Sequence, residues 1–175
     1  MTSMDFQSYV YNEAIDIYDR RVFIDELNPE TDLGLEADLS MLLSRPEREL
    51  RSVAISALIG RYQSKKHLGL VLKLAQSETS RMVLSALIYA LIYFYYDQRS
   101  FKEEIQRTLL TLHLEIDPDY ENLHKYMHQA LTITQRPEQM FWKLASKLNW
   151  KEEVDWELLE HLMPDPNIPK RELTR

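Results

Sequence analysis

The sequence contains no cysteine and only three glycines. Without cysteine, the chain can form no disulfide framework, no thiolate metal site and no cysteine nucleophile. The few glycines leave few positions for tight hairpin turns, so the composition favours an all-α fold. The first residues lack a basic region followed by an apolar run. We therefore expect no secretory signal and a cytoplasmic location.

Motifs of enzymes are also missing. The chain has no glycine-rich phosphate-binding motif of the GxxxxGK[ST] or GxGxxG type, no GxSxG elbow and no HExxH. Paired carboxylates do occur, as at Glu103 and Glu104, but adjacent residues of a helix point about 100° apart. Such pairs are more typical of solvated faces than of an acid and base that share one substrate. The sequence predicts a non-enzymatic protein with no cofactor and no catalytic residue.

Long hydrophobic runs are scarce as well. The longest extends from Met82 to Tyr96, is interrupted only by Ser85, and is bounded by Arg81 and Asp97. A membrane-spanning helix needs about 20 apolar residues, which this run does not reach. We therefore expect it to form a buried helix of a globular protein and not a membrane span.

The most informative feature that is present is a short echo. Ser-Ala-Leu-Ile occurs at residues 56–59 and again at residues 85–88, each time within an apolar helical stretch. An echo at a separation near thirty residues indicates stacked helix pairs. The residues that carry the pattern are Arg51, Val53, Ala54, Ala57 and Leu58, and then Arg81, Val83, Leu84, Leu87 and Leu91.

Over residues 42–91 this pattern resembles HEAT-type helical repeats. The resemblance implies an α-solenoid of stacked antiparallel helix pairs, with about seven or eight helices in the whole chain. The echo does not continue after Asp97, and the acidic first helix has no place in the repeat. An irregular helical bundle therefore remains the alternative architecture.

We expect a single helical domain over residues 1–163. It comprises an acidic helix over 5–27 with its following loop, repeat-like helix pairs over 41–96, and further helices over 97–163, including helices at 136–148 and 152–163. Capping boxes are predicted at Ser44 with Glu47 and at Ser100 with Glu103. The three prolines of residues 164–175 predict a loose tail.

Negative charge is concentrated at one end of the chain. Residues 1–40 hold ten acidic and two basic side chains, whereas residues 41–96 hold eight basic and three acidic ones. A surface of one charge sign selects and accelerates association with a partner of the opposite sign. We therefore expect a basic protein partner, held by aromatic anchors and carboxylates: Asp16, Asp19, Asp25, Glu26, Glu30, Asp32, Glu36, Asp38, Tyr95 and Tyr96.

In size, acidity and lack of cysteine and catalytic motifs, the chain resembles the immunity proteins of bacterial toxin systems such as contact-dependent growth inhibition. The resemblance implies that it binds a cognate toxin, often a basic nuclease, and covers or distorts the active site of that toxin. It transfers no individual residue, because the class shares no motif. A general helical-repeat scaffold or adaptor is the alternative within the same class of function.

Two further hypotheses remain open. Basic residues cluster between residues 45 and 81, and some helical-repeat proteins hold nucleic acid on such a surface. The residues are Arg45, Arg48, Arg51, Arg61, Lys65, Lys66, Lys73 and Arg81. Against this stand the acidic pI of about 5.3 and the lack of interleaved exposed aromatic residues in the stretch.

The second hypothesis is a metal-dependent enzyme. Glu121, His124 and His128 stand three and four residues apart, so one helix face could offer a carboxylate and two imidazoles to a metal ion. Because Leu123 and Met127 already define a buried stripe there, we favour a partly exposed polar face and predict no metal site.

Overall fold

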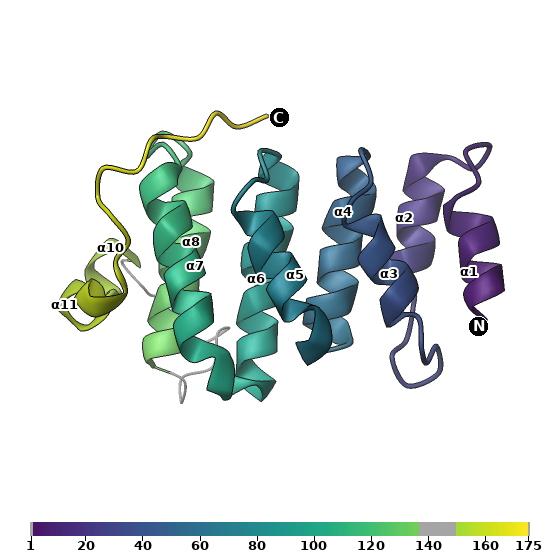
Figure 1. The fold of residues 1–175 in the computed structure, drawn as a ribbon, viewed down its shortest axis with the longest axis horizontal. Coiled ribbons are helices and arrows are strands. Elements are labelled where there is room, and N and C mark those ends of the chain that lie inside the picture. The colour runs from purple at the N-terminus through teal and green to yellow at the C-terminus, as the bar shows by residue number, and fades with distance from the viewer. Residues whose placement is uncertain (1, 137–149, 175) are drawn as a thin grey trace.

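The computed structural model describes residues 2–136 and 150–174, and within them the protein is helical with no strand. The all-α prediction is confirmed. Figure 1 shows the helices standing side by side along one axis. The helices are α1 (Ser3–Val10), α2 (Ile17–Asp25), α3 (Glu36–Leu42), α4 (Arg48–Ile55), α5 (Lys65–Ala75), α6 (Arg81–Asp97), α7 (Lys102–Glu115), α8 (Glu121–Gln135), α10 (Trp150–Glu153) and α11 (Trp156–Leu159).

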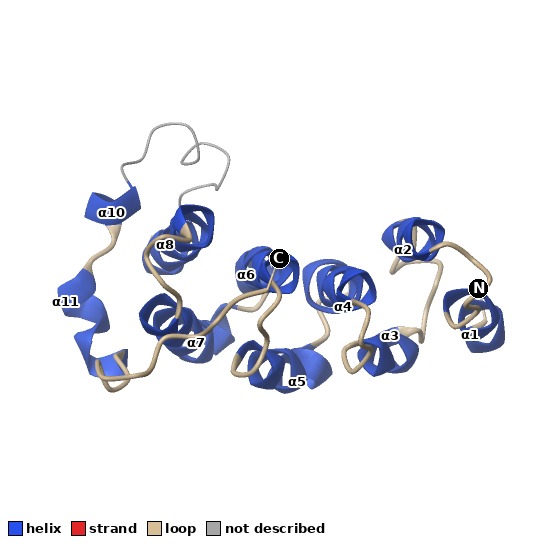
Figure 2. Ribbon diagram, turned by 90° about the horizontal axis from the view of Figure 1, so that it is seen from above, coloured by secondary structure: helices blue, strands red, loops and turns tan. Residues whose placement is uncertain are grey.

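The helices form two layers. Figure 2 shows α2, α4, α6 and α8 in one layer and α1, α3, α5 and α7 in the other. From α1 to α8, consecutive helices run antiparallel and alternate between the two layers. The part of the chain described here includes no helix that is long and apolar enough to cross a membrane.

The echoed segments lie at the centre of the packing. Leu58 and Ile59 of the first copy and Leu87 and Ile88 of the second are fully buried. The second copy belongs to α6, whereas the first lies in a π-helix over Ser56–Arg61 that extends α4. Wider i to i+5 hydrogen bonding turns this segment by a different angle per residue than an α-helix. Both copies nevertheless supply the buried scaffold.

The first helix is shorter than expected. α1 ends at Val10 and α2 begins at Ile17, so the prediction of one helix over 5–27 is wrong. The Asn12 side chain accepts a hydrogen bond from the backbone N–H of Ala14 at 3.0 Å. The Asp16 side chain caps α2 by accepting from the N–H of Tyr18 at 2.8 Å. Asparagine and aspartate compete with the helical backbone in this way, which starts a new helix.

Neither predicted capping box forms. The Ser44 hydroxyl donates to the carbonyl of Met41 at 2.9 Å, and α4 has Glu47 as its N-cap without a side-chain hydrogen bond. The carboxylate of Glu47 instead accepts from Arg45, a charged donor that competes successfully with a backbone N–H. α7 follows a 3₁₀ turn and has Phe101 at its N-cap, so a Ser100 cap is excluded.

The C-terminal helices also differ from the prediction. The helix expected over 136–148 lies almost wholly outside the described residues. The helix expected over 152–163 is divided into α10, α11 and a 3₁₀ turn over Glu160–Leu162. The division follows from Asp155, whose side chain accepts from the N–H of Leu158 at 3.0 Å and so begins α11 anew.

The segment after residue 163 lies against the helices, where the sequence predicted a loose tail. Its Arg171 guanidinium donates to the carbonyls of Ala75 at 2.6 Å, Gln76 at 3.0 Å and Glu78 at 2.8 Å, and it also pairs with the carboxylate of Glu115. Carbonyls at a helix C-terminus have no partner within the helix. Arg171 satisfies those that end α5 and thereby fixes the tail to the fold.

Candidate partner-binding surface

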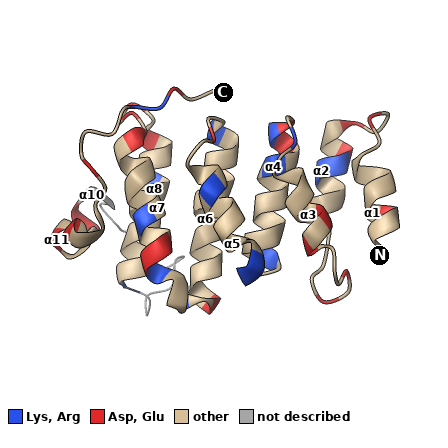
Figure 3. Ribbon diagram, in the orientation of Figure 1, with Lys and Arg blue, Asp and Glu red and all other residues tan. Residues whose placement is uncertain are grey.

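Five of the predicted acidic residues are exposed. They surround α2 and the loops at its two ends, and Figure 3 shows acidic residues in both of these loops and on α3. The exposed set consists of Asp16, Asp19, Asp25, Glu26 and Glu30. All five are exposed to a partner, and Asp16 also caps α2.

Three predicted acidic residues have intramolecular roles instead. The Asp32 carboxylate accepts a backbone N–H of its own loop at 3.0 Å, and this bond lowers the pKa of Asp32. Glu36 accepts from the Ser64 hydroxyl at 2.6 Å. Asp38 is buried and accepts from the Gln7 side chain at 2.5 Å. These contacts stabilise the fold, so we no longer assign the three residues to the partner surface.

The two predicted tyrosine anchors do not stand out from the surface. Tyr95 is only 2% exposed, and its hydroxyl donates to the carbonyl of Thr134 at 3.1 Å. Its assignment as an anchor is wrong, because a helix that is apolar on nearly all sides is enclosed by its neighbours. Tyr96 is half-buried and packs against the core.

An aromatic residue that the sequence analysis did not select is exposed on α2. Tyr18 is 65% exposed, and Val22, one turn further along the helix, is 51% exposed. Positions three or four apart share a helix face, so Tyr18 and Asp19 on one side and Asp25 and Glu26 on the other all lie one turn from Val22. We call these five residues, Tyr18, Asp19, Val22, Asp25 and Glu26, the α2 face.

The α2 face is negatively charged. Asp25 lies 3.7 Å from the guanidinium nitrogens of both Arg21 and Arg61, a separation typical of weak, solvent-screened pairs. Three carboxylates of the face and Asp16 at the helix N-cap therefore outweigh the nearby positive charge. The signal that could have pointed to Tyr18 was its place in the acidic segment, between Asp16 and Asp19.

Arg61 holds α2 in place. Its guanidinium donates to the carbonyls of Ile24 at 3.0 Å, Asp25 at 2.5 Å and Leu27 at 3.2 Å, which close the C-terminus of the helix. From the other side, the buried Arg20 side chain donates to the carbonyl of Val10 at the end of α1. A rigid helix loses little entropy when it binds, so this anchoring suits a recognition surface.

Other arginines of the basic stretch also make contacts within the protein. Arg45 forms a two-point ion pair with Glu47, and Arg51 forms another with Glu78. Arg61 caps α2, as described above. The exposed basic residues on α5 are Lys65, Lys66 and Lys73. Because the arginines make intramolecular contacts, the stretch offers a nucleic acid far less positive charge than the sequence suggested.

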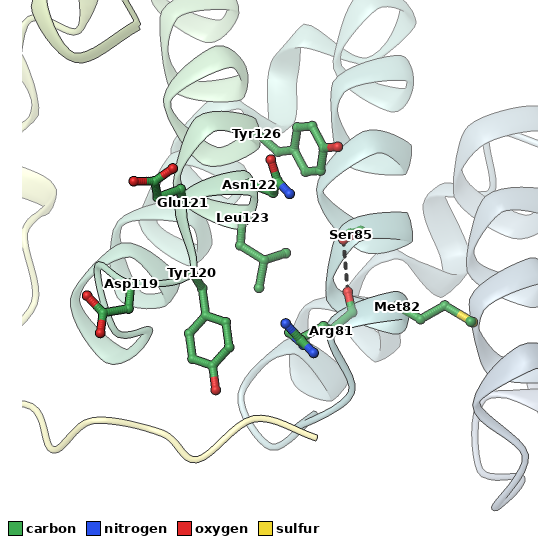
Figure 4. A pocket seen from close by; sticks show the side chains of 9 residues that line it. All are labelled: Arg81, Met82, Ser85, Asp119, Tyr120, Glu121, Asn122, Leu123 and Tyr126. Atoms are coloured by element: carbon green, nitrogen blue, oxygen red, sulfur yellow. Dashed lines mark hydrogen bonds between the residues drawn. The ribbon is translucent and has the colours of Figure 1, made fainter. Parts of the chain in front are cut away.

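A groove of about 440 Å³ opens between the N-terminal ends of α6 and α8. Figure 4 shows the Arg81 guanidinium on one side of the Tyr120 ring, 5.4 Å from the ring centre. The carboxylates of Asp119 and Glu121 lie on the other side of that ring. The lining residues are Arg81, Met82, Ser85, Asp119, Tyr120, Glu121, Asn122, Leu123 and Tyr126. Charges of both signs meet here, so the groove favours neither a cationic nor an anionic ligand.

The predicted trio of Glu121, His124 and His128 is only partly brought together. Glu121 lines the groove, whereas the two histidines meet His113 of α7. The candidate donor atoms of the three histidines all lie within 4.8 Å of one another. Sequence reasoning missed His113 because it lies on the preceding helix, at no helical spacing from the other two.

Comparison with known proteins finds no matching family model, no matching curated protein and no matching solved structure.

Proposed function

We propose that this protein is a non-enzymatic binding protein that holds a positively charged protein partner on its α2 face. The observation that supports this proposal most strongly is the exposure of Tyr18 and Val22 within a ring of carboxylates. A large apolar side chain left in water gains free energy when a partner covers it. The carboxylates around it favour a partner that carries lysine or arginine.

The two kinds of residue contribute to binding in different ways. Tyrosine is enriched among the few residues that dominate interface energies, since it buries a large area and loses little conformational entropy. Carboxylates at the rim chiefly raise the association rate and exclude partners of like charge. In the proposed complex, Tyr18 and Val22 supply most of the affinity, while Asp19, Asp25 and Glu26 supply selectivity.

Within this class, the proposed role is that of an immunity or inhibitor protein that neutralises a basic toxin such as a nuclease in the cytoplasm. The supporting features are the missing catalytic motifs and the excess of acidic residues before residue 40. An acidic inhibitor complements the basic surface with which a nuclease binds its own substrate. A scaffold or adaptor would use the same α2 face but would leave the activity of its partner intact.

Affinity capture from the native cell, followed by mass spectrometry, tests the proposal. The wild-type chain should retain a basic protein in equimolar amount, and the variant Tyr18→Ala, Asp19→Lys, Glu26→Lys should lose it. The matched control reverses two exposed carboxylates of α7, Glu103→Lys and Glu104→Lys, and should retain the partner. Retention by the α2 variant would contradict the proposed surface, and co-purification of nucleic acid in place of a protein would contradict the proposed function.

A further inference from the structure

Three imidazoles from two helices converge near the C-terminal end of the fold. His113 lies on α7, and His124 and His128 lie one turn apart on α8. The ring centre of His113 is 5.0 Å from those of both His124 and His128, which are 6.2 Å from each other. The α2 face belongs to the opposite end of the row of helices, so this cluster is separate from the proposed partner surface (Figure 1).

Hydrogen bonds determine which nitrogen of His124 carries its proton. Nε2 of His124 lies 3.1 Å from the carbonyl oxygen of Ile116. A carbonyl can only accept, so Nε2 must donate, and the neutral ring then has its lone pair on Nδ1. That Nδ1 lies 3.1 Å from Nδ1 of His113. A backbone carbonyl that orients an imidazole through its second nitrogen is the usual support of a histidine metal ligand.

We propose that His113, His124 and His128 form a binding site for a divalent transition-metal ion of the zinc class. Nitrogens bound tetrahedrally to zinc at about 2.05 Å are roughly 3.3 Å apart. The two Nδ1 atoms already have nearly this separation, and the spacings to the third imidazole, all within 4.8 Å, need to shorten by at most about 1.5 Å. Rotation of one imidazole about its side-chain torsions supplies such a movement.

The donor set selects the class of metal. Three neutral imidazoles suit zinc, copper, nickel or iron, whereas calcium and magnesium require oxygen ligands. The ion takes the place of the proton between the two Nδ1 atoms, and His113 stays neutral by carrying its proton on Nε2. Three protein ligands leave a fourth position for water or for a donor from another molecule.

An indole ring covers the cluster. The Trp156 ring stacks on His113 at 5.0 Å and meets His128 edge-on at 5.4 Å, which covers the cluster with an apolar surface. Neutral imidazole is the metal-binding form, and the hydrogen bond to the Ile116 carbonyl holds His124 in the tautomer whose lone pair on Nδ1 faces His113.

The site would also join the last helices. His113 belongs to α7, the other two ligands to α8, and Trp156 above them to α11. A bound ion would therefore join α7 to α8 by coordination, where a hydrogen bond between His113 and His124 now joins them, beneath the Trp156 ring of α11. An ion that binds only the folded state stabilises that state. A rise in melting temperature therefore reports metal binding independently of the metal content of the protein.

The test uses the full chain, freed of any histidine tag, dialysed against Zn²⁺ and then analysed for its metal content. We expect one zinc per chain and, at free zinc a hundredfold above Kd, a rise in Tm of about 5 to 10 °C. Co²⁺ in place of Zn²⁺ should give the intense visible absorption of a four-coordinate site. A free Zn²⁺ concentration of about 100 µM lies far above the Kd of a structural zinc site. Absence of bound zinc at this concentration overturns the proposal.

Variants assign the ligands. His113→Asn and His124→Asn should each weaken zinc binding by at least about 100-fold, as expected when a ligand is lost. His161→Asn changes an exposed histidine of the last 3₁₀ turn and should bind zinc as the wild type does. Circular dichroism identifies any variant that fails to fold, and His113, which is only partly buried, is a safer site to change than the buried His128. Equal zinc binding by folded His113→Asn and wild type would overturn the assignment.

Discussion

The guanidinium of Arg51 forms a two-point ion pair with the carboxylate of Glu78, with Nε to Oε2 at 2.9 Å and Nη2 to Oε1 at 3.0 Å. The side chains are only 15% and 4% exposed. The same Glu78 carboxylate accepts the backbone N–H groups of Thr79 and Ser80 at the start of α6. One ion pair thus connects the start of α4 with the connection between α5 and α6.

Breaking this pair should destabilise the fold. We expect Arg51→Ala to lower the free energy of unfolding by about 3 kcal/mol, because it leaves the buried Glu78 carboxylate without its counter-charge. Arg48→Ala is the matched control, since Arg48 is 43% exposed and its pair with Glu49 should contribute at most about 1 kcal/mol. Guanidinium denaturation measures both values. Equal losses would show that the buried pair has no special structural role.

Removing the Arg171 side chain should detach the C-terminal segment. Arg171→Ala removes a charged donor from three carbonyls at the end of α5 and from Glu115, and we expect a loss of roughly 2 to 4 kcal/mol in unfolding free energy. The neighbouring exposed Glu172 provides the control, and Glu172→Ala should change stability by less than about 0.5 kcal/mol. A loose tail would instead make the two variants indistinguishable.

Stability should fall in mild acid. The folded-state pKa of His113, about 4, lies below the ordinary value of 6.5, so between these values the unfolded chain binds a proton that the folded chain excludes. His124 of α8 has a pKa lowered by burial, and Lys170 also faces His113, so both act in the same direction. Stability is thus fully present above pH 6.5 and declines as the pH falls toward 4.

Thermal melts in the presence of a chelator measure this decline. His113→Phe should give a shallower loss of Tm between pH 6.5 and 5, a range in which carboxylates with ordinary pKa values stay largely ionised. The slope of unfolding free energy against pH counts the protons taken up on unfolding. A wild-type Tm that stays constant across this range would contradict the burial of neutral imidazoles in the cluster.

Nucleic acid should bind weakly or not at all. Arg45, Arg51 and Arg61 are engaged within the protein, which leaves mainly the lysines of α5 to contact phosphates. We expect no saturable binding of labelled duplex or single-stranded DNA or RNA at micromolar protein and low salt. Saturable binding that Lys65→Ala together with Lys66→Ala abolishes would restore the nucleic-acid hypothesis.

The sequence was sufficient to predict the middle of the fold. The apolar run from Met82 to Tyr96 predicted a buried helix and located α6 closely, because a helix enclosed by its neighbours is apolar on nearly all sides. The echo at residues 56–59 was expected within an apolar helical stretch, and its Ala57, Leu58 and Ile59 are buried, but its π-helical form was not predicted. Helical spacing says which side chains are buried and does not say whether the backbone bonds run to i+4 or i+5.

Contacts between residues that are distant in sequence could not be predicted from the sequence. Nothing local distinguishes Arg171, a tail residue, from a solvated arginine, since its partners lie on α5 and α7. For the same reason, Asp38 was expected at the surface although it is buried beside Gln7. In the histidine cluster, the i, i+4 pair was visible in the sequence, whereas His113 depended on how α7 packs against α8.

The most direct test of the proposed function is the association rate of the captured partner, measured by stopped flow at several salt concentrations. If the α2 face guides binding, the rate falls steeply with added salt in the wild type. Asp19→Lys with Glu26→Lys should then lower the low-salt rate at least about 10-fold and flatten its salt dependence, while the helix content stays unchanged. Wild-type rates and salt dependence in that variant would contradict the assignment of the α2 face as the binding surface.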